Sequence, residues 1–532
     1  MTRDGLCPCI MFQGTSSDAG KSVLATAMCR ILSNLGYKVA PFKAQNMANN
    51  SYVTKEGLEI GRAQGVQAEA ARVDAEAAMN PILLKPSSEG SSQIVLMGKA
   101  LEDVKAREYR ENWVPYLWPK VQEALRELRL KYDFVIMEGA GSPAEINLRK
   151  RDLTNMEVAG EAGAKVVLVS DIEKGGMLAS VVGTLELLEE WERDLIAGIV
   201  VNKFRGDKKL LEPGLDFLEK KTGKPVLGVI PYFNESLVDA EDSLSLSRKL
   251  TRNSASNAAD SWKDNTIDTN SEGKVKIGVI NLTRISNFTD FDPLEEHPGI
   301  DLNYLPLEKE IDEIDCILIP GSKATREDMV RFMESKLYNS IINRGYFDTK
   351  PVMGICGGYQ MLGMEIKDYE GLEGHPGEIK GLGLLPLVTD FIKEKKTVWA
   401  NCKVTVNNHI FKPLESEVIR GYEIHLGRTR VLDGKYSWLF DEENNSKGAI
   451  SADNRILGTY LHDIFNNDSF INWFLAWIKS WKHYNNAEGI EEFYFDNKDN
   501  KVDVWDREEK YEKLANIVKE NFDYHDLMNG MS

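Results

Sequence analysis

The sequence reads Gly14-Thr15-Ser16-Ser17-Asp18-Ala19-Gly20-Lys21-Ser22 directly after an apolar run at residues 9–12 and directly before a helical pattern at residues 23–35. A glycine-rich loop between a strand and a helix can turn its backbone N–H groups and the helix N-terminus towards phosphate oxygens. Lys21 can then reach the terminal phosphates of a nucleotide, and Ser22 can bind Mg²⁺. The sequence therefore predicts an ATP site at Gly14, Thr15, Asp18, Gly20, Lys21 and Ser22.

The spacing of this loop is a variant, because five residues separate Gly14 from Gly20 where the usual phosphate loop has four. The alternative interpretation is a surface turn rich in glycine and serine, with a lysine in solvent. The predicted strand before the loop and the predicted helix after it favour the nucleotide site.

Polar side chains also end three later strands that we predict in this half of the chain. Lys43 follows the apolar run 39–42, Glu138 follows 134–137 and Asn202 follows 196–201. Ligand sites of α/β folds gather at such strand ends. Glu138 could hold Mg²⁺ directly or through water, and Lys43 could steady a carboxylate or a transferring phosphate. The Asn202 amide could read the edge of a nucleotide base. An ordinary surface position is the alternative for each of the three.

A polar segment at residues 251–273 divides the chain into two halves. In both halves, short apolar runs alternate with helical stretches, a pattern that predicts doubly wound, mostly parallel sheets covered by helices on both faces. We therefore predict a first α/β domain at 1–250, a linker at 251–273 and a second α/β domain at 274–480. The remaining residues, 481–532, form a C-terminal extension whose role the sequence does not reveal.

The composition of the chain narrows the class of protein further. The 532 residues are 42% hydrophobic and 28% charged, which is enough apolar material for more than one core. The formal net charge of −18 opposes binding to nucleic acid or to anionic membranes. Six cysteines are too few for a disulfide scaffold, and no window has the ~18 consecutive apolar residues of a membrane span. These features predict a cytoplasmic protein.

The second half contains the motif Gly354-Ile355-Cys356-Gly357-Gly358, between the apolar run 352–355 and a helical stretch. This is the strand-to-helix turn on which α/β enzymes present a nucleophile, and its glycines tolerate strained backbone and close approach of a substrate. The helix N-terminus favours the thiolate form, and the Gly357 N–H could serve as one oxyanion donor. A buried structural cysteine is the alternative.

A nucleophilic Cys356 needs a base, and the sequence offers two candidates. His462 ends the late strand pattern at 456–461, whereas His425 lies in the stretch Gly421-Tyr422-Glu423-Ile424-His425-Leu426-Gly427-Arg428. The strand end can face the top of the same sheet as Cys356, so these residues favour His462 but leave His425 open.

Taken together, the two motifs resemble the cobyric acid synthase family, whose members are glutamine-dependent amidases of cobalamin synthesis. The resemblance covers nearly the whole chain to about Phe465. In the first half it rests on the phosphate loop with Gln13 before it, on Ala40-Pro41-Phe42-Lys43-Ala44-Gln45-Asn46-Met47, on Glu59-Ile60-Gly61-Arg62-Ala63-Gln64 and on Asn80-Pro81-Ile82-Leu83-Leu84-Lys85-Pro86. In the second half it rests on 319–328, the Cys356 motif, 421–429 and 458–462.

The resemblance implies a fold and a set of site residues. The first half resembles the P-loop ATP domain of dethiobiotin synthetase, and the second half is similar to a flavodoxin-like class I glutamine amidotransferase domain. Cys356 is then the glutaminase nucleophile, His462 its base, and the N–H groups of Gly321 and Gly357 the oxyanion donors. The ATP domain would bind nucleotide with the phosphate loop and Asn202, substrate with Lys43, Gln45, Asn46 and Lys85, and metal with Ser22 and Glu138.

One position departs from the general class I pattern. That pattern has a glutamate two residues after the histidine, and this chain has Ile464 there. The branch that contains cobyric acid synthase and cobyrinate a,c-diamide synthase is similar in lacking the glutamate, so the departure agrees with the resemblance. It leaves open which residue orients His462, and we suggest Glu423.

The implied activity is amidation of the b, d, e and g carboxylates of adenosylcobyrinic acid a,c-diamide, with ATP, Mg²⁺ and L-glutamine. Two alternatives remain at this stage. Cobyrinate a,c-diamide synthase performs the same chemistry on different carboxylates, but Gln45-Asn46-Met47 and Gly61-Arg62-Ala63-Gln64 disfavour it. A noncatalytic regulator that binds nucleotide or corrinoid is disfavoured by the intact Lys21, Glu138, Cys356 and His462. The oligomeric state is not predicted.

Overall fold

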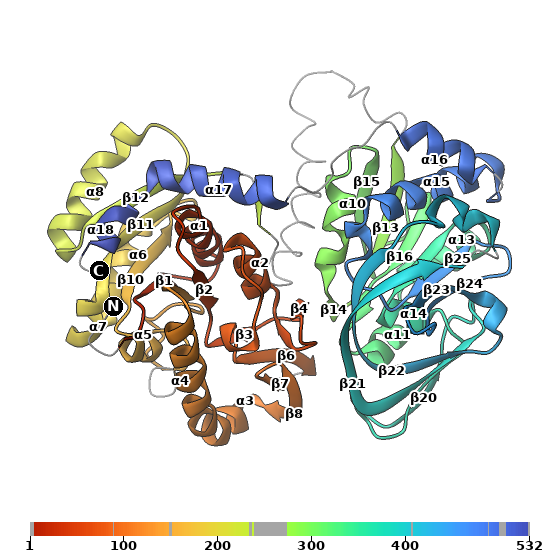
Figure 1. The fold of residues 1–532 in the computed structure, drawn as a ribbon, viewed down its shortest axis with the longest axis horizontal. Coiled ribbons are helices and arrows are strands. Elements are labelled where there is room, and N and C mark those ends of the chain that lie inside the picture. Colours follow the sequence, from red (N-terminus) through yellow and green to blue (C-terminus); the bar gives the residue numbers. More distant parts are fainter. Residues whose placement is uncertain are drawn as a thin grey trace. The chain divides into compact units, whose positions relative to one another are not determined.

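Figure 1 shows the computed structural model, which describes residues 5–88, 90–147, 152–233, 237–238, 274–405, 408–487, 489–498 and 507–529. The chain forms two compact units, which are described separately. The first unit comprises Met1–Lys85, Gly90–Glu241 and Asp506–Ser532, and the second comprises Pro86–Glu89 and Asp242–Trp505. The linker predicted at 251–273 lies outside the described residues.

A six-stranded parallel sheet forms the centre of the first unit, in the order β12-β11-β10-β1-β9-β2. Alternate residues of its strands enter two cores. Ile10 and Phe12 of β1 pack on the side of α1, whereas Met11 packs on the side of α4. The strands are β1 (Cys9–Gly14), β2 (Val39–Phe42), β9 (Phe134–Glu138), β10 (Lys165–Asp171), β11 (Ile196–Phe204) and β12 (Val226–Pro231).

Helices cover both faces of this sheet (Figure 1). They are α1 (Lys21–Asn34), α2 (Arg62–Ala70), α4 (Val114–Lys131), α5 (Met156–Ala162), α6 (Met177–Leu187), α7 (Glu190–Leu195) and α8 (Lys208–Thr222). A smaller sheet follows β2 in the chain and has the order β3-β6-β7-β8: β3 (Gln45–Met47), β6 (Ile82–Ser88), β7 (Ser91–Leu96) and β8 (Lys99–Lys105). A separate hairpin pairs β4 (Ser51–Val53) with β5 (Glu59–Gly61).

The end of the chain returns to the first unit. Helix α17 (Arg507–Asn521) lies beside α1 (Figure 1), and its Tyr511, Leu514 and Val518 share a core with Leu24 and Met28 of α1. Helix α18 (Tyr524–Met528) follows it. Two earlier helices of the predicted extension, the end of α15 (Asp468–Tyr484) and α16 (Ile490–Lys498), belong instead to the second unit.

The second unit contains one large mixed sheet, in the order β15-β13-β16-β18-β25-β24-β23-β21-β19-β20, with β22 paired to β21. Its parallel part is β15 (Ile300–Pro306), β13 (Val275–Asn281), β16 (Cys316–Ile319), β18 (Val352–Ile355) and β25 (Ile456–Thr459). An antiparallel extension contains β21 (Leu387–Val404), β22 (Ile419–Val431), β23 (Ser437–Asp441) and β24 (Ser446–Ile450), and β19 (Glu365–Asp368) and β20 (Gly377–Lys380) lie at the edge. The α/β fold class predicted from the sequence is confirmed, with this antiparallel extension added.

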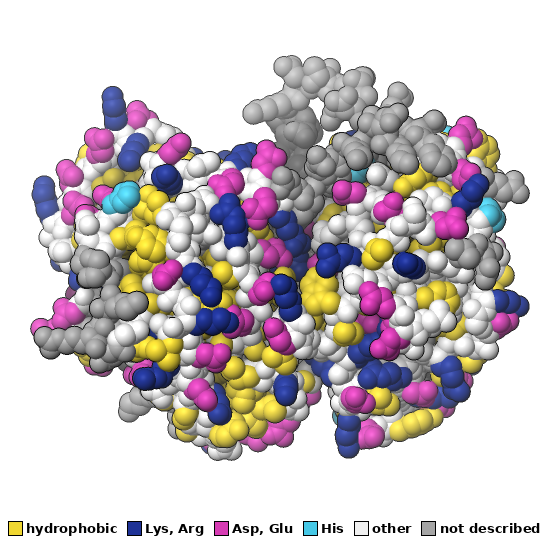
Figure 2. Space-filling view, viewed as in Figure 1, with side chains coloured by type: hydrophobic (Ala, Val, Ile, Leu, Met, Phe, Trp, Pro, Cys, Tyr) yellow, Lys and Arg dark blue, Asp and Glu magenta, His cyan; other side chains and the backbone are white. Residues whose placement is uncertain are grey.

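The helices of the second unit that matter for the site flank the parallel strands. They are η7 (Phe288–Phe291), α10 (Asp292–Glu296), α11 (Thr325–Met333), α12 (Lys336–Asn343), α13 (Tyr346–Thr349) and α14 (Gly357–Met361). On the face shown in Figure 2, acidic and basic side chains are interspersed over the surface of each unit. Among the described helices, none has both the length and the apolar character that crossing a membrane requires.

Candidate active sites

Cys356 lies at the sharp turn between β18 and α14, as the glycine-flanked motif predicts. Its backbone has φ +52° and ψ −106°, an unfavourable conformation for a residue with a side chain. The turn is held because Cys356 N–H donates to Thr459 O at 2.8 Å and Gln360 N–H donates to Cys356 O at 3.1 Å. A Cβ atom on Gly358 would lie 2.0 Å from Ile319 O, so only glycine allows the helix to start this close to β16. The turn therefore presents one nucleophilic side chain on a fixed backbone.

The predicted oxyanion donors come together at this turn. A Cβ on Gly357 would lie 2.8 Å from the backbone nitrogen of Ser322, and a Cβ on Gly321 would lie 3.3 Å from Cε1 of His462. The segment Gly321–Ser322 (β17) thus lies against Gly357 on one side and the imidazole on the other. The two segments that carry the predicted oxyanion donors thus lie next to each other at the nucleophile turn.

His462 follows β25 and lies beside Cys356. His462 is 1% exposed, and its imidazole stacks on Tyr422 at a centroid distance of 5.3 Å and donates from Nδ1 to Asp290 Oδ2 at 2.6 Å. Burial lowers the pKa of His462, but the Asp290 carboxylate, the Cys356 sulfur and the hydrogen bonds to both outweigh burial and raise the pKa to about 10. The ring therefore lies between the Cys356 sulfur and the Asp290 carboxylate, and both favour its protonated form.

Our suggestion that Glu423 orients His462 is wrong. The partner of His462 is Asp290, whereas Glu423 Oε2 lies 3.0 Å from His425 Nε2. Both candidate residues on β22 point into a different buried cluster. No local motif marks Asp290, because it precedes His462 by 172 residues and neighbours it only through tertiary packing.

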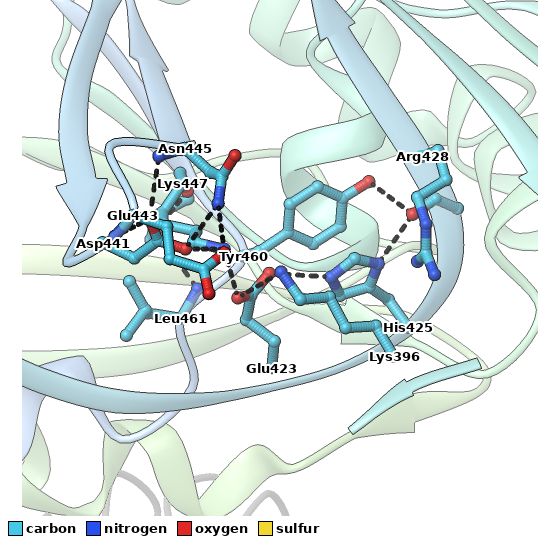
Figure 3. Close-up of polar contacts among 12 residues, drawn as sticks. Lys396, Glu423, His425, Arg428, Asp441, Glu443, Asn445, Lys447, Tyr460 and Leu461 are labelled. Carbon is cyan, nitrogen blue, oxygen red and sulfur yellow. Dashed lines mark hydrogen bonds and ion pairs between the residues drawn. The ribbon is translucent and has the colours of Figure 1, made fainter. Parts of the chain in front are cut away.

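That cluster on β22 is shown in Figure 3. Glu423 is 1% exposed and its Oε1 lies 2.9 Å from the ammonium groups of both Lys396 and Lys447. His425 stacks on Tyr460 at 3.7 Å and its Nδ1 lies 2.6 Å from Gly427 O. Both ring nitrogens of His425 thus face acceptors other than Cys356. The Cys356 thiol itself donates to Ile424 O at 3.6 Å, so this cluster holds the strand against which the nucleophile rests.

The phosphate loop of the first unit begins at the end of β1 and leads directly into α1. The Lys21 side chain curls over the loop, and its ammonium donates to Ser16 O and to Gly141 O, each at 3.3 Å. Thr15 N–H donates to Val169 O at 2.9 Å, and Asp18 has a positive φ of 58° with its carbonyl accepting from Lys203 Nζ at 2.9 Å. Gly14 and Lys21 thus lie at the carboxyl edge of the parallel sheet, where a nucleotide phosphate can approach.

Asn202 packs directly under this loop. Its Nδ2 donates to Ala19 O at 2.8 Å, and its Oδ1 accepts the N–H of Lys203 at 2.9 Å. Gly20 has φ +100°, and a Cβ there would lie 2.0 Å from Asn202 Nδ2. The amide that the sequence offers for a nucleotide base therefore supports the loop backbone in this conformation.

Ser22, Lys43 and Glu138 meet in one buried group. Glu138 is 1% exposed, and its Oε1 accepts from Ser22 Oγ at 3.0 Å and from Lys43 Nζ at 2.8 Å. Its Oε2 accepts from Gln67 Nε2 at 2.7 Å, a contact from α2 that no sequence motif predicts. The Ser22 hydroxyl beside the Glu138 carboxylate is a pair of oxygen donors that fits Mg²⁺. In this structure the Lys43 ammonium neutralises the buried carboxylate.

The other three predicted substrate residues have partners within the protein. The Lys85 ammonium contacts Glu59 Oε1 at 2.6 Å and Ser51 Oγ at 2.8 Å, all of them buried. Gln45 Oε1 accepts from the Tyr109 hydroxyl, and Asn46 Nδ2 donates to Gln64 Oε1 at 3.1 Å. Lys85 is therefore brought together with Glu59, and not with the group formed by Ser22, Lys43 and Glu138.

Each unit matches a family model that agrees with this geometry. Residues 10–244 match the CobQ/CobB/MinD/ParA nucleotide binding domain, and residues 276–470 match the CobB/CobQ-like glutamine amidotransferase domain. The fold and the two sites thus define a glutamine amidotransferase joined to a nucleotide-binding domain in one chain.

Curated relatives narrow this class to one family. The chain is 44% identical over 514 residues to a cobyric acid synthase of Desulfitobacterium hafniense, covering 97% of this chain and 96% of the relative. It is 47% identical over 461 residues to the enzyme of that name from Geobacillus thermodenitrificans (87% and 88%), and 43% identical over 529 residues to that of Desulforamulus reducens (98% and 98%). The chain belongs to the cobyric acid synthase family. This confirms the resemblance found in the sequence and the predicted class of ATP-dependent, glutamine-hydrolysing ligase.

Proposed function

We propose that the protein amidates the b, d, e and g carboxylates of adenosylcobyrinic acid a,c-diamide, using ammonia from glutamine and energy from ATP. The observation that carries this proposal is the presence of both half-sites in one chain of this family. Cys356 and His462 stand at a nucleophile turn in the second unit, and Lys21, Ser22 and Glu138 surround a phosphate loop in the first. The cytoplasm, where free thiols persist, suits the six cysteines, all of them free and buried.

In the glutaminase half, Cys356 Sγ attacks the carboxamide carbon of glutamine. The negative charge that develops on the carboxamide oxygen is stabilised by backbone N–H groups of Gly357 and the Gly321 segment. His462 donates its Nε2 proton to the leaving nitrogen, so ammonia departs and a glutamyl thioester remains. The neutral imidazole then takes a proton from water, which attacks the thioester and releases glutamate and the thiol.

In the synthetase half, ATP transfers its terminal phosphoryl group to a corrinoid carboxylate. A carboxylate is a poor acyl donor, and the acyl phosphate gives ammonia a carbonyl with phosphate as leaving group. The loop backbone and Lys21 would hold the transferring phosphoryl group. Ser22 and Glu138 would hold Mg²⁺, which supplies positive charge against the phosphate oxygens.

The substrate side of this half is the least constrained. We propose that Lys43, Gln45, Asn46 and Lys85 line the route of the corrinoid, since all four lie on or next to β3 and β6 beyond the end of β2. Lys43 is the best placed of them, because it already contacts the Glu138 oxygen that receives Ser22. We also propose that the Asn202 amide supports nucleotide binding through the loop backbone that it holds.

Mass spectrometry of the product tests the proposal. Incubation of the protein with adenosylcobyrinic acid a,c-diamide, MgATP and glutamine should convert four carboxyl groups to carboxamides. A product with no added amide would contradict the proposal. Activity only on cobyrinic acid, with two amidations, would also contradict it and would favour cobyrinate a,c-diamide synthase. Cys356→Ala should stop the use of glutamine and leave the reaction with high concentrations of ammonia intact.

A further inference from the structure

Asp290 belongs to η7, a short 3₁₀ turn between β13 and α10 in the second unit. Asp290 is 2% exposed, although no sequence motif of the glutaminase includes this segment. The same segment supports the His462 ring from a second direction, because Asn287 Nδ2 donates to the hydroxyl of Tyr422, whose ring stacks on His462. The segment from Asn287 to Asp290 thus contacts the histidine directly and through its aromatic neighbour.

The two oxygens of Asp290 have separate partners, both at the end of β25. Oδ2 accepts the His462 Nδ1–H at 2.6 Å, and Oδ1 accepts the backbone N–H of Asp463 at 3.0 Å. Asp463 has a positive φ of 61°, so the backbone bends away immediately after the histidine. The carboxylate is consequently clamped between its two donors and cannot rotate without losing one of them.

We propose that Asp290 is the positioning residue of the glutaminase, which fixes the proton of His462 on Nδ1 and leaves Nε2 to exchange protons with Cys356 and the leaving ammonia. The inference rests on the proposed function of Cys356 and His462. A carboxylate can only accept hydrogen bonds, so the contact at 2.6 Å requires the Nδ1–H form of the ring. Asp290 therefore performs, from a distant segment, the task that the residue at position 464 cannot perform as isoleucine.

The charge of Asp290 also sets the protonation state of His462. The groups that face the ring are Asp290 from η7, Cys356 from the nucleophile turn and the stacked Tyr422 from β22, while Asp463 contributes its backbone N–H to the carboxylate. The pKa of His462 is raised to about 10, so the imidazolium persists from acidic pH up to that value and is lost above it. Removal of the Asp290 charge should move this limit down towards the ordinary histidine pKa of about 6.5.

Asp290→Asn removes the charge of Asp290 and changes its hydrogen bonding to His462, but keeps the size and shape of the side chain. The Asp463 N–H still needs an acceptor, which pins the oxygen of the substituted amide there and turns its NH₂ group towards His462 Nδ1. Because Nδ1 must then accept, the proton moves to Nε2 and the ring loses the lone pair that takes the proton of water. The change is isosteric, so the wrong tautomer is the main consequence.

Glutamine hydrolysis and ammonia-dependent amidation should be measured on the full chain for wild type, Asp290→Asn and Asp315→Asn. Asp315 is a matched control, since this buried carboxylate of the same unit also accepts from a backbone N–H, that of Lys276 at 2.9 Å, and from a cation, Lys482 at 2.9 Å. Asp290→Asn should lower kcat for glutamine hydrolysis by about 10²- to 10⁴-fold with little change in KM, while Asp315→Asn stays near wild type. Ammonia-dependent amidation should survive in both variants.

The pH dependence of Cys356 alkylation distinguishes this role from a purely structural one, because a structural role would not change it. In wild type, reactivity of Cys356 with iodoacetamide should be high at neutral pH, because the imidazolium stabilises the thiolate. In Asp290→Asn the half-maximal reactivity should move to higher pH. The proposal is overturned if hydrolysis by Asp290→Asn stays within about threefold of wild type, or if its alkylation profile coincides with that of wild type. Loss of ammonia-dependent amidation as well would show a folding role and overturn it too. A wild-type protein that does not hydrolyse glutamine would instead contradict the proposed function.

Discussion

The two half-sites differ in what their buried charged groups contact. In the second unit, His462 lies between Cys356 and Asp290, so the groups that would carry the reaction already face one another. In the first unit, the buried cations Lys43 and Lys85 contact the carboxylates Glu138 and Glu59 at 2.8 and 2.6 Å. The groups of the glutaminase site thus already face one another, whereas these two buried cations of the first unit are neutralised by carboxylates of the protein.

A buried lysine near a predicted ligand site can therefore serve the stability of the protein as well as ligand binding. Removal of one partner from a buried pair leaves an unpaired charge and costs about 3–5 kcal/mol. Such a lysine is required for stability even without a ligand, because its removal would leave a carboxylate buried and unpaired. Lys21 differs in that its ammonium contacts the backbone carbonyls of Ser16 and Gly141, each at 3.3 Å, and a phosphate oxygen can replace such contacts.

The largest effect is expected from the two histidines of the second unit, His462 and His425. His462→Ala should lower glutamine hydrolysis by about 10²- to 10⁴-fold, because it removes the group that moves protons. His425→Ala should have a much smaller effect on kcat, since both ring nitrogens of His425 contact Gly427 O and Glu423. Steady-state assays of glutamate release compare them. Equal losses in the two variants would show that the choice of base is wrong.

A second test asks whether Lys85 acts in stability or in substrate binding. Lys85→Met should lower the free energy of unfolding by about 3–5 kcal/mol, because the buried Glu59 carboxylate loses its ion pair with Lys85. The double variant Lys85→Met with Glu59→Leu is the control, and it should recover most of that loss since no charge is stranded. Thermal unfolding followed by circular dichroism measures both. An unchanged melting temperature together with a raised KM for the corrinoid would assign Lys85 to the substrate instead.

A third test concerns the phosphate loop itself. Lys21→Ala should reduce amidation by about 10²- to 10³-fold with glutamine or with ammonia, because the transferring phosphoryl group loses its cation. Glutamine hydrolysis measured without ATP should stay unchanged. Lys174→Ala is the matched control, since this exposed lysine also donates to a loop carbonyl, Ser17 O at 3.3 Å. A similar loss in both variants would mean that the loop tolerates no change, and it would remove Lys21 from its proposed role.

The sequence predicted those parts of the sites in which steric constraints within a short stretch of chain determine the residue types. A phosphate loop needs Gly20 because its Cβ would strike Asn202, and the nucleophile turn needs Gly358 because its Cβ would strike Ile319 O. Such constraints are local, so they leave a motif. The family resemblance then supplied His462, which the residues alone favoured without deciding.

The remaining contacts depend on packing between distant segments and leave no motif. Asp290 meets His462 across 172 residues, and Gln67 meets Glu138 across 71. The Glu423 suggestion failed because successive side chains on β22 point to opposite faces of the strand. Tyr422 stacks on His462, so its neighbour Glu423 points to the other face, where it contacts Lys447 and His425. The return of α17 to the first unit is equally invisible, since its apolar face could cover any helix.

The attachment of α17 gives the smallest effect that we expect. Arg30 of α1 is fully buried, and its guanidinium makes two hydrogen bonds to Glu508, at 2.8 and 2.9 Å, but the Glu508 side chain remains 58% exposed. Solvent therefore screens the pair, and Glu508→Gln should cost about 1 kcal/mol or less.

The stability lost in Glu508→Gln should be smaller in high salt and at low pH. The hydrogen bond from Arg30 lowers the pKa of Glu508, so the stabilisation is present above the ordinary glutamate pKa and is lost as the pH falls through the lowered value. Melting temperatures of wild type, Glu508→Gln and the control Glu520→Gln, an exposed glutamate of the same helix, measure the effect at two salt concentrations. A loss of several kcal/mol that salt does not change would show that the pair is desolvated. The end of the chain would then stabilise the helix that carries Lys21 more strongly than the exposure of Glu508 implies.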